Sequence, residues 1–143
     1  MIWKVLPDID AINNFNSNTL VANLGIEIVE FGPDYVKAKM PVDHRTKQPM
    51  GLLHGGASVA LSESIGSMAS WAFTADQNLD IVGLEVNANH LKSVRSGYVY
   101  SITKPVKLGR TIHVWSTEIF DENNDLVCIS RLTTMIRKRK IVV

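Results

Sequence analysis

Residues 51–73 read Gly51-Leu-Leu-His-Gly-Gly-Ala-Ser-Val-Ala-Leu-Ser-Glu-Ser-Ile-Gly-Ser-Met-Ala-Ser-Trp-Ala-Phe73. From Ala57 onward this segment has no proline, a single glycine and many strong helix formers, which favours a helix of roughly five turns. Apolar or small residues occur on every face of that helix. A helix of this kind is normally buried. The segment therefore predicts a central buried helix.

One charged residue, Glu63, lies within the predicted helix. A buried carboxylate is costly unless it is paired or used, so Glu63 is a candidate functional group. Just upstream, His54-Gly55-Gly56 leaves backbone N–H groups of the first turn open. These N–H groups and the positive end of the helix dipole suit a developing oxyanion.

Three simpler interpretations compete with a functional site here. The helix could cross a membrane, although Glu63 and the serines interrupt the apolar run that this requires. Glu63 could be a core acid whose charge is satisfied by neighbours. The glycine pair after His54 could be an ordinary turn before the helix.

The composition is that of one globular domain over residues 1–143, at 15.9 kDa with 45% hydrophobic and 20% charged residues. A net charge of +1 gives no reason to expect nucleic acid or a membrane surface as a partner. The single Cys128 excludes an internal disulfide, and the first residues lack the apolar core of a signal peptide, so we expect a cytoplasmic protein. The four histidines show no metal-ligand spacing, so no metal site is expected.

The rest of the chain predicts one short helix and six extended segments. A helix over residues 11–15 has Asp8 or Asp10 as its cap, and Pro105 indicates a kink, bulge or edge position. The extended segments are 26–31, 35–40, 81–91, 98–108, 111–120 and 126–136, followed by a basic end at 137–143. Runs of strands around one long helix favour an α+β fold.

Four stretches carry a family resemblance. They are residues 45–67 (Arg45-Thr-Lys-Gln-Pro-Met-Gly-Leu-Leu-His-Gly-Gly-Ala-Ser-Val-Ala-Leu-Ser-Glu-Ser-Ile-Gly-Ser67), 82–90 (Val82-Gly-Leu-Glu-Val-Asn-Ala-Asn-His90), 105–110 (Pro105-Val-Lys-Leu-Gly-Arg110) and 114–134. They resemble the hotdog-fold acyl-CoA thioesterases, in the bacterial branch that includes dihydroxynaphthoyl-CoA and enterobactin proofreading thioesterases. The resemblance runs from Met1 to about Met135. It implies a central helix wrapped by a curved antiparallel sheet, and a homotetramer built as a dimer of dimers.

The resemblance also implies functional residues. Glu63 matches a helical carboxylate that acts as nucleophile or general base, and Gly55 matches the N–H that binds the thioester oxygen. Gln48 and His54 match side chains near that carbonyl, and Ser67 matches a residue beside the water or the acyl ring. Substrate-binding positions are implied at Gly83, His90, Leu91, Lys92, Ser93, Lys107, Leu108, Gly109 and Arg110. In the family, Glu63 would face Gln48, His54 and Gly55 of a neighbouring subunit.

These positions imply hydrolysis of an aromatic acyl-CoA, with dihydroxynaphthoyl-CoA of menaquinone synthesis as the expected substrate. No cofactor is expected, because coenzyme A arrives as part of the substrate. Two other functions stay open: proofreading of acyl groups misloaded on an acyl carrier protein, which would land near Lys92 and Arg110, and acyl-CoA binding without catalysis. Met50 and Met68 replace residues that are common in the branch, which leaves the acyl group open.

Overall fold

The computed structural model describes residues 1–4, 6–76 and 78–139. Its elements are α1 (Ile9–Phe15), α2 (Leu20–Asn23), β1 (Glu27–Phe31), β2 (Val36–Pro41), α3 (Gly55–Thr74), β3 (Leu79–His90), β4 (Tyr98–Leu108), β5 (Ile112–Asp121) and β6 (Leu126–Lys138). The predicted order of one short helix, two strands, a long helix and four strands is confirmed. Only α2 was not predicted, because four residues give too short a pattern to recognise.

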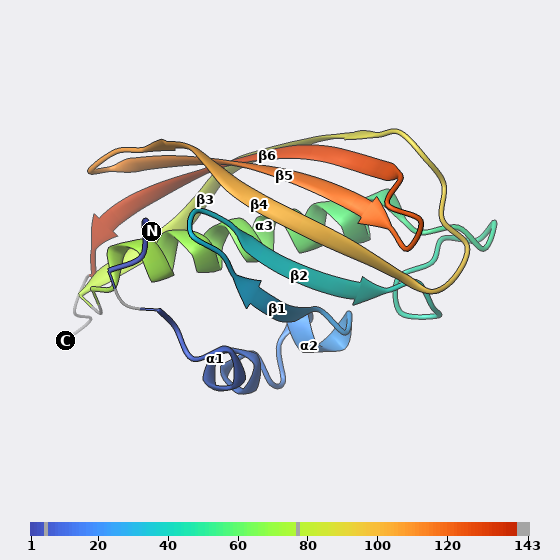
Figure 1. The fold of residues 1–143 in the computed structure, drawn as a ribbon, viewed down its shortest axis with the longest axis horizontal. Coiled ribbons are helices and arrows are strands. Elements are labelled where there is room, and N and C mark those ends of the chain that lie inside the picture. The colour runs from blue at the N-terminus through green and yellow to red at the C-terminus, as the bar shows by residue number, and fades with distance from the viewer. Residues whose placement is uncertain (5, 77, 140–143) are drawn as a thin grey trace.

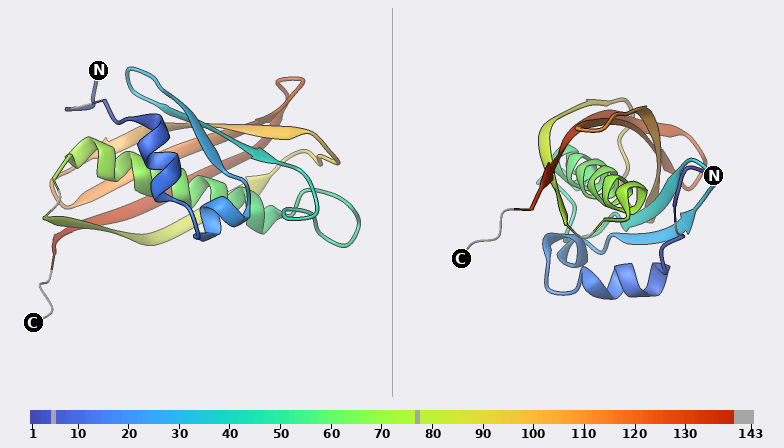
Figure 2. Two further views of the ribbon diagram at one scale, coloured as in Figure 1. Left: turned by 90° about the horizontal axis from the view of Figure 1, so that it is seen from below. Right: turned by 90° about the vertical axis from the view of Figure 1, so that its left-hand side faces the viewer.

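The six strands form one antiparallel sheet in the order β1-β2-β4-β5-β6-β3. The sheet curls around α3, with α1 and α2 on the side that the sheet leaves open (Figures 1 and 2). The expected α+β architecture, a long helix wrapped by a curved antiparallel sheet, is therefore confirmed. Pro105, where the sequence predicted a kink, a bulge or an edge position, lies at a register shift between Pro105 and Lys107 opposite β5, which is the bulge among these alternatives.

Helix α3 begins at an N-cap formed by His54 and ends where Ala75 takes a left-handed conformation with φ 47°. Its buried residues face the sheet, and they include Leu61, Ile65 and Ala69. The prediction that this helix is buried on all sides was wrong for the single chain. Glu63 is exposed, because the sheet covers one side of α3 and Glu63 projects from another. None of the helices in the described part of the chain is long and apolar enough to span a membrane.

A buried polar cluster lies between the second half of α3 and the sheet. The Ser70 hydroxyl accepts a hydrogen bond from Trp115 Nε1 at 2.7 Å, and it also bonds His113 Nδ1 at 3.1 Å and Thr134 Oγ1 at 2.9 Å. Because a buried polar group costs free energy unless it is paired, this cluster fixes how α3 is rotated against β5 and β6.

One asparagine hydrogen-bonds helix α1 to the edge of the sheet. Asp8 caps the helix by accepting hydrogen bonds from the N–H groups of Asp10 and Ala11. The Asn13 side chain then donates to the carbonyl oxygen of Ile28 on β1 and accepts from the Ile28 N–H, both at 3.0 Å. The Asn13 side chain therefore makes the two hydrogen bonds that the backbone of a neighbouring strand would make at the edge of β1.

Candidate active site

A pocket of about 350 Å³ lies at the N-terminal end of α3. Its walls come from the loop before the helix, from the first turn of α3 and from the end of β3. The lining residues are Gln48, Leu52, Leu53, Gly55, Ser58, His90, Leu91, Lys92, Ser93 and Val127. The fold thus brings Gln48, Gly55 and the 90–93 segment together, although up to 45 residues separate them in the chain.

The N–H of Gly55 is open toward this pocket. His54 caps the helix by accepting a 2.7 Å hydrogen bond at Nδ1 from the Gly56 N–H. Within the described residues, the Gly55 N–H has no acceptor of its own. Because Nδ1 of His54 is used as an acceptor, Nε2 is the ring nitrogen left to donate. The start of α3 therefore offers the pocket one free backbone N–H, a suitable donor for a carbonyl oxygen, whereas His54 is not among the described residues that line the pocket.

Gly55 is close-packed against His90. A Cβ on Gly55 would lie 2.7 Å from His90 Nε2, closer than real Cβ contacts allow. A residue larger than glycine would therefore push the His90 ring away from the first turn of α3. The contact between Gly55 and His90 closes one side of the pocket.

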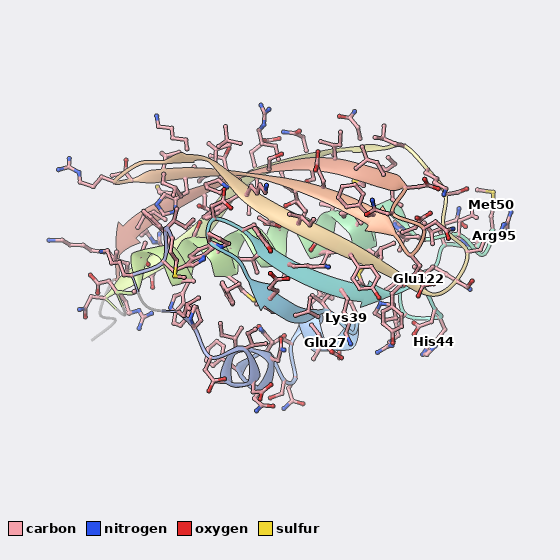
Figure 3. The ribbon with its side chains drawn as sticks, viewed as in Figure 1. Glu27, Lys39, His44, Met50, Arg95 and Glu122 are labelled. Atoms are coloured by element: carbon pink, nitrogen blue, oxygen red, sulfur yellow. The ribbon has the colours of Figure 1, made fainter. Side chains whose placement is uncertain are left out.

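Gln48 is oriented by its own loop. Its Oε1 accepts a hydrogen bond from the Met50 N–H, which leaves the amide NH₂ group as the part that can donate to a ligand. Met50 is exposed at the tip of this loop, at the same end of the molecule as Arg95 (Figure 3). The expected role of Gln48, polarising a carbonyl, needs a donor, and this orientation supplies one.

Glu63 and Gly83 form a second group on the same chain. Glu63 Oε1 lies 2.8 Å from the position that a Cβ on Gly83 would occupy, so the carboxylate rests against bare backbone of β3. Ser67 follows one turn later on the same face of α3. Gly55 and Glu63 are eight residues apart, which places them roughly 12 Å apart along the helix axis. One chain therefore does not bring Glu63 to the carbonyl site at Gly55.

Lys92 is already paired. Its Nζ bonds Asp121 at 2.6 Å and Asp125 at 2.5 Å, and these bonds raise the pKa of the Lys92 ammonium and lower the pKa of Asp121. Two carboxylates already offset its charge, so Lys92 is a weaker phosphate ligand than its sequence position suggested. Its main structural effect is to tie the 91–97 segment to the β5–β6 turn.

The 107–110 segment lies at the other end of the molecule. The end of β4 and the β4–β5 turn consist of Lys107, Leu108, Gly109 and Arg110. Leu108 pairs with His113 on β5. His113 contacts Phe73 and Ser70, near the C-terminal end of α3. Since α3 has 20 residues and spans roughly 30 Å, the 107–110 and 90–93 segments do not meet on one chain.

A second and more apolar cavity, of about 490 Å³, lies between α1 and α3. It is lined by Pro7, Asp8, Ala11, Ile12, Phe15, Asn16, Ser67, Met68 and Trp71. The sequence pointed to Ser67 and noted Met68, but it gave no role to α1. The apolar spacing of Ala11, Ile12 and Phe15 along one helix face was the available signal.

Comparison with known proteins finds the same family that the sequence resembles. Residues 50–128 match the family model described as the Thioesterase superfamily. The chain is 51% identical over 136 residues to a 1,4-dihydroxy-2-naphthoyl-CoA hydrolase of Escherichia coli, covering 95% of this chain and 99% of that protein. It is 46% identical to a proofreading thioesterase of Cronobacter turicensis, covering 95% and 98%.

Solved structures are similar over nearly the whole chain. A crystal structure of a thioesterase from Haemophilus influenzae superposes with a TM-score of 0.92 and 49% sequence identity, covering 96% of each chain. The hotdog fold and the family resemblance inferred from residues 45–67, 82–90, 105–110 and 114–134 are therefore confirmed.

Proposed function

This chain belongs to the Thioesterase superfamily and is a thioester hydrolase, and we propose that it cleaves an aromatic acyl-CoA with Glu63 as the catalytic carboxylate. The observation that carries this proposal is the pocket at the start of α3, where the free Gly55 N–H, Gln48 and His90 converge. We further propose 1,4-dihydroxy-2-naphthoyl-CoA as the substrate, since a relative at 51% identity has the name of that hydrolase.

The proposed reaction needs two groups of residues. The Gly55 N–H and the donors of Gln48 and His54 hold the thioester oxygen and stabilise its developing negative charge. Glu63 then acts in one of two ways. It removes a proton from a water that attacks the carbonyl carbon, or it attacks that carbon itself and the resulting anhydride is hydrolysed. Either route breaks the C–S bond, and the thiolate of coenzyme A takes up a proton.

We propose that these two groups meet across the interface of a homodimer. Gly55 and Glu63 are roughly 12 Å apart along one helix, too far for both to act on one carbonyl. The strand beside Glu63, β3, is a 12-residue edge of the sheet with Leu84 half exposed. Long open edges are normally covered, and pairing β3 with β3 of a second copy would cover both. The same pairing would carry Gln48 and Gly55 of one copy toward Glu63 of the other.

Thiol release from a panel of aromatic and aliphatic acyl-CoA esters tests the reaction. We expect the wild type to prefer aromatic esters, and Glu63→Gln to lose at least about a hundredfold in kcat. Glu63→Gln keeps the size of the side chain and removes only the charge. Turnover that survives this change would move the chemistry away from Glu63.

Mixing two inactive variants tests the shared site. Gln48→Ala and Glu63→Gln, each inactive alone, should regain up to about a quarter of the wild-type activity when they are unfolded and refolded together in equal amounts. About half of the dimers are then mixed, and each mixed dimer has one intact site of its two. A mixture that stays inactive would overturn the interface proposal.

Rapid turnover of acyl groups on a carrier protein, with slow turnover of coenzyme A esters, would favour the proofreading role.

A further inference from the structure

Three serines of α3 are buried, and one of them differs from the other two. Ser58, Ser62 and Ser70 are each at most 2% exposed. The hydroxyls of Ser62 and Ser70 form hydrogen bonds to side chains of the sheet, among them Ser130 at 2.8 Å and Thr134 at 2.9 Å. Within the described residues, no hydrogen bond involves the Ser58 hydroxyl. Because a buried polar group without a partner costs free energy, this hydroxyl requires a partner other than these residues.

The Ser58 hydroxyl borders the pocket at the start of α3. Ser58 is one of the residues that line this pocket. Side chains of a helix tilt toward its N-terminus, so this hydroxyl is directed back toward the first turn of α3. Ser101 also lacks a partner among the described residues, but it is sealed in the core and lines neither cavity. The hydroxyl of Ser58 is therefore available to a ligand, whereas that of Ser101 is not.

Ser58 lies on the same side of α3 as Gly55. The two residues are three positions apart in one helix, and such residues are neighbours, at roughly 5–6 Å between Cβ positions. Two hydrogen bonds of about 2.8 Å each span this distance, so one oxygen atom between the Gly55 N–H and the Ser58 O–H can accept from both. The hydroxyl can rotate toward such an oxygen without giving up a bond to any described residue.

We infer that the Ser58 hydroxyl donates a hydrogen bond to the thioester carbonyl oxygen of the substrate, alongside the Gly55 N–H. The inference rests on the proposed function, which places this carbonyl at Gly55. Negative charge develops on the oxygen as the carbonyl carbon is attacked, so the hydrogen bond is strongest in the transition state. Loss of the hydroxyl therefore lowers kcat more than it raises KM.

Ser58→Ala and Ser62→Ala should have opposite effects. Ser58→Ala should lower kcat/KM for benzoyl-CoA at least about tenfold and leave the melting temperature unchanged, because the lost hydroxyl has no partner among the described residues. Ser62→Ala is the matched control one turn further along α3. It loses the bond to Ser130, so its melting temperature should fall by about 2–4 °C while kcat/KM stays unchanged. A Ser58→Ala variant as active as the wild type would overturn the inference.

Binding to an inactive protein shows which part of the substrate the hydroxyl contacts. In the Glu63→Gln background, isothermal titration calorimetry compares two analogues. One is S-benzyl-coenzyme A, a thioether without a carbonyl oxygen, and the other is the phenyl ketone in which a CH₂ group replaces the thioester sulfur. Adding Ser58→Ala should raise the Kd of the ketone about tenfold and change the Kd of the thioether by less than about twofold. Equal weakening of both would place the hydroxyl against the pantetheine arm and overturn the inference.

The two measurements separate this inference from the proposed function. If the wild type hydrolyses no acyl-CoA ester but Ser58→Ala still weakens the ketone selectively, the proposed function fails and Ser58 stands as a carbonyl-binding residue. If the wild type hydrolyses aromatic esters and Ser58→Ala does so equally fast, the inference about Ser58 fails alone.

Discussion

The Oε1 oxygen of Glu63 lies 2.8 Å from the point where a Cβ on Gly83 would stand. Residue 83 therefore has no room for a side chain while the carboxylate keeps this position. The contact joins the middle of α3 to the edge strand β3, and it sets the carboxylate against the β3 backbone. Gly83 is thus a positioning residue for the proposed catalytic group.

Gly83→Ala should lower kcat about ten- to a hundredfold without unfolding the protein, because the new methyl group pushes the flexible end of Glu63 aside and small displacements are costly. Alanine suits a strand at least as well as glycine, so the melting temperature should not fall. Leu84→Ala, on the neighbouring exposed residue, is the control. Unchanged kcat in Gly83→Ala would show that this carboxylate position is not the reactive one.

Gly55→Ala should weaken catalysis through His90. The added methyl group would lie 2.7 Å from His90 Nε2, so either the ring or the helix entrance must move. We expect kcat/KM to fall at least tenfold. Combining Gly55→Ala with His90→Ala removes the collision, so the double variant should be no worse than His90→Ala alone. Comparing kcat/KM among the wild type, the two single variants and the double variant measures this coupling. Additive losses would mean that the two residues act independently.

His113 should make stability depend on pH. Burial lowers its pKa, and the contact with the Gly109 backbone offsets only part of this effect. The unfolded chain therefore binds a proton near pH 6.5, where the folded chain does not, so stability should fall as pH drops below about 6.5 and level off below the folded pKa. Urea unfolding between pH 5 and about 7.5 measures this slope.

The matched variants are His113→Gln and His44→Gln. His113→Gln removes the slope near pH 6.5, whereas His44→Gln keeps it, since the His44 side chain is 89% exposed. An unchanged slope in His113→Gln would assign the pH dependence to other groups.

Asn13→Ala should loosen α1 from the sheet. The side chain makes two hydrogen bonds to Ile28, and their loss should cost about 1–2 kcal/mol of stability. Amide hydrogen exchange in α1 should speed up more than in α3. Asn14→Ala, the exposed neighbour, is the control. Equal exchange in both variants would show that α1 is held by other contacts.

The sequence predicted the long helix well because its signals are local. Residues 57–73 combine strong helix formers with the absence of proline, and the structure extends the helix only to Gly55 and Thr74. The strands were predicted within a few residues at each end for the same reason, because alternation and turn residues are properties of neighbouring positions. Helix α2 was missed because four residues give too short a pattern to recognise.

The candidate site was predicted only in part. Gln48, Gly55 and the 90–93 segment line one pocket, whereas their roles in binding and catalysis stay predictions. Glu63 was expected to be buried and is exposed in the single chain. That prediction failed because composition shows that a helix is apolar but not which side the sheet covers.

By itself, the sequence determined the type and order of the strands and of the helices other than α2, and the chemical groups available for thioester hydrolysis, because these depend on residue identity and local spacing. Only the tertiary structure decided which groups lie together. It paired Lys92 with Asp121 and Asp125, set Glu63 against Gly83, and formed the apolar cavity beneath α1. Such contacts join residues 20 to 60 positions apart, and they depend on sheet register and helix rotation, which no local pattern encodes.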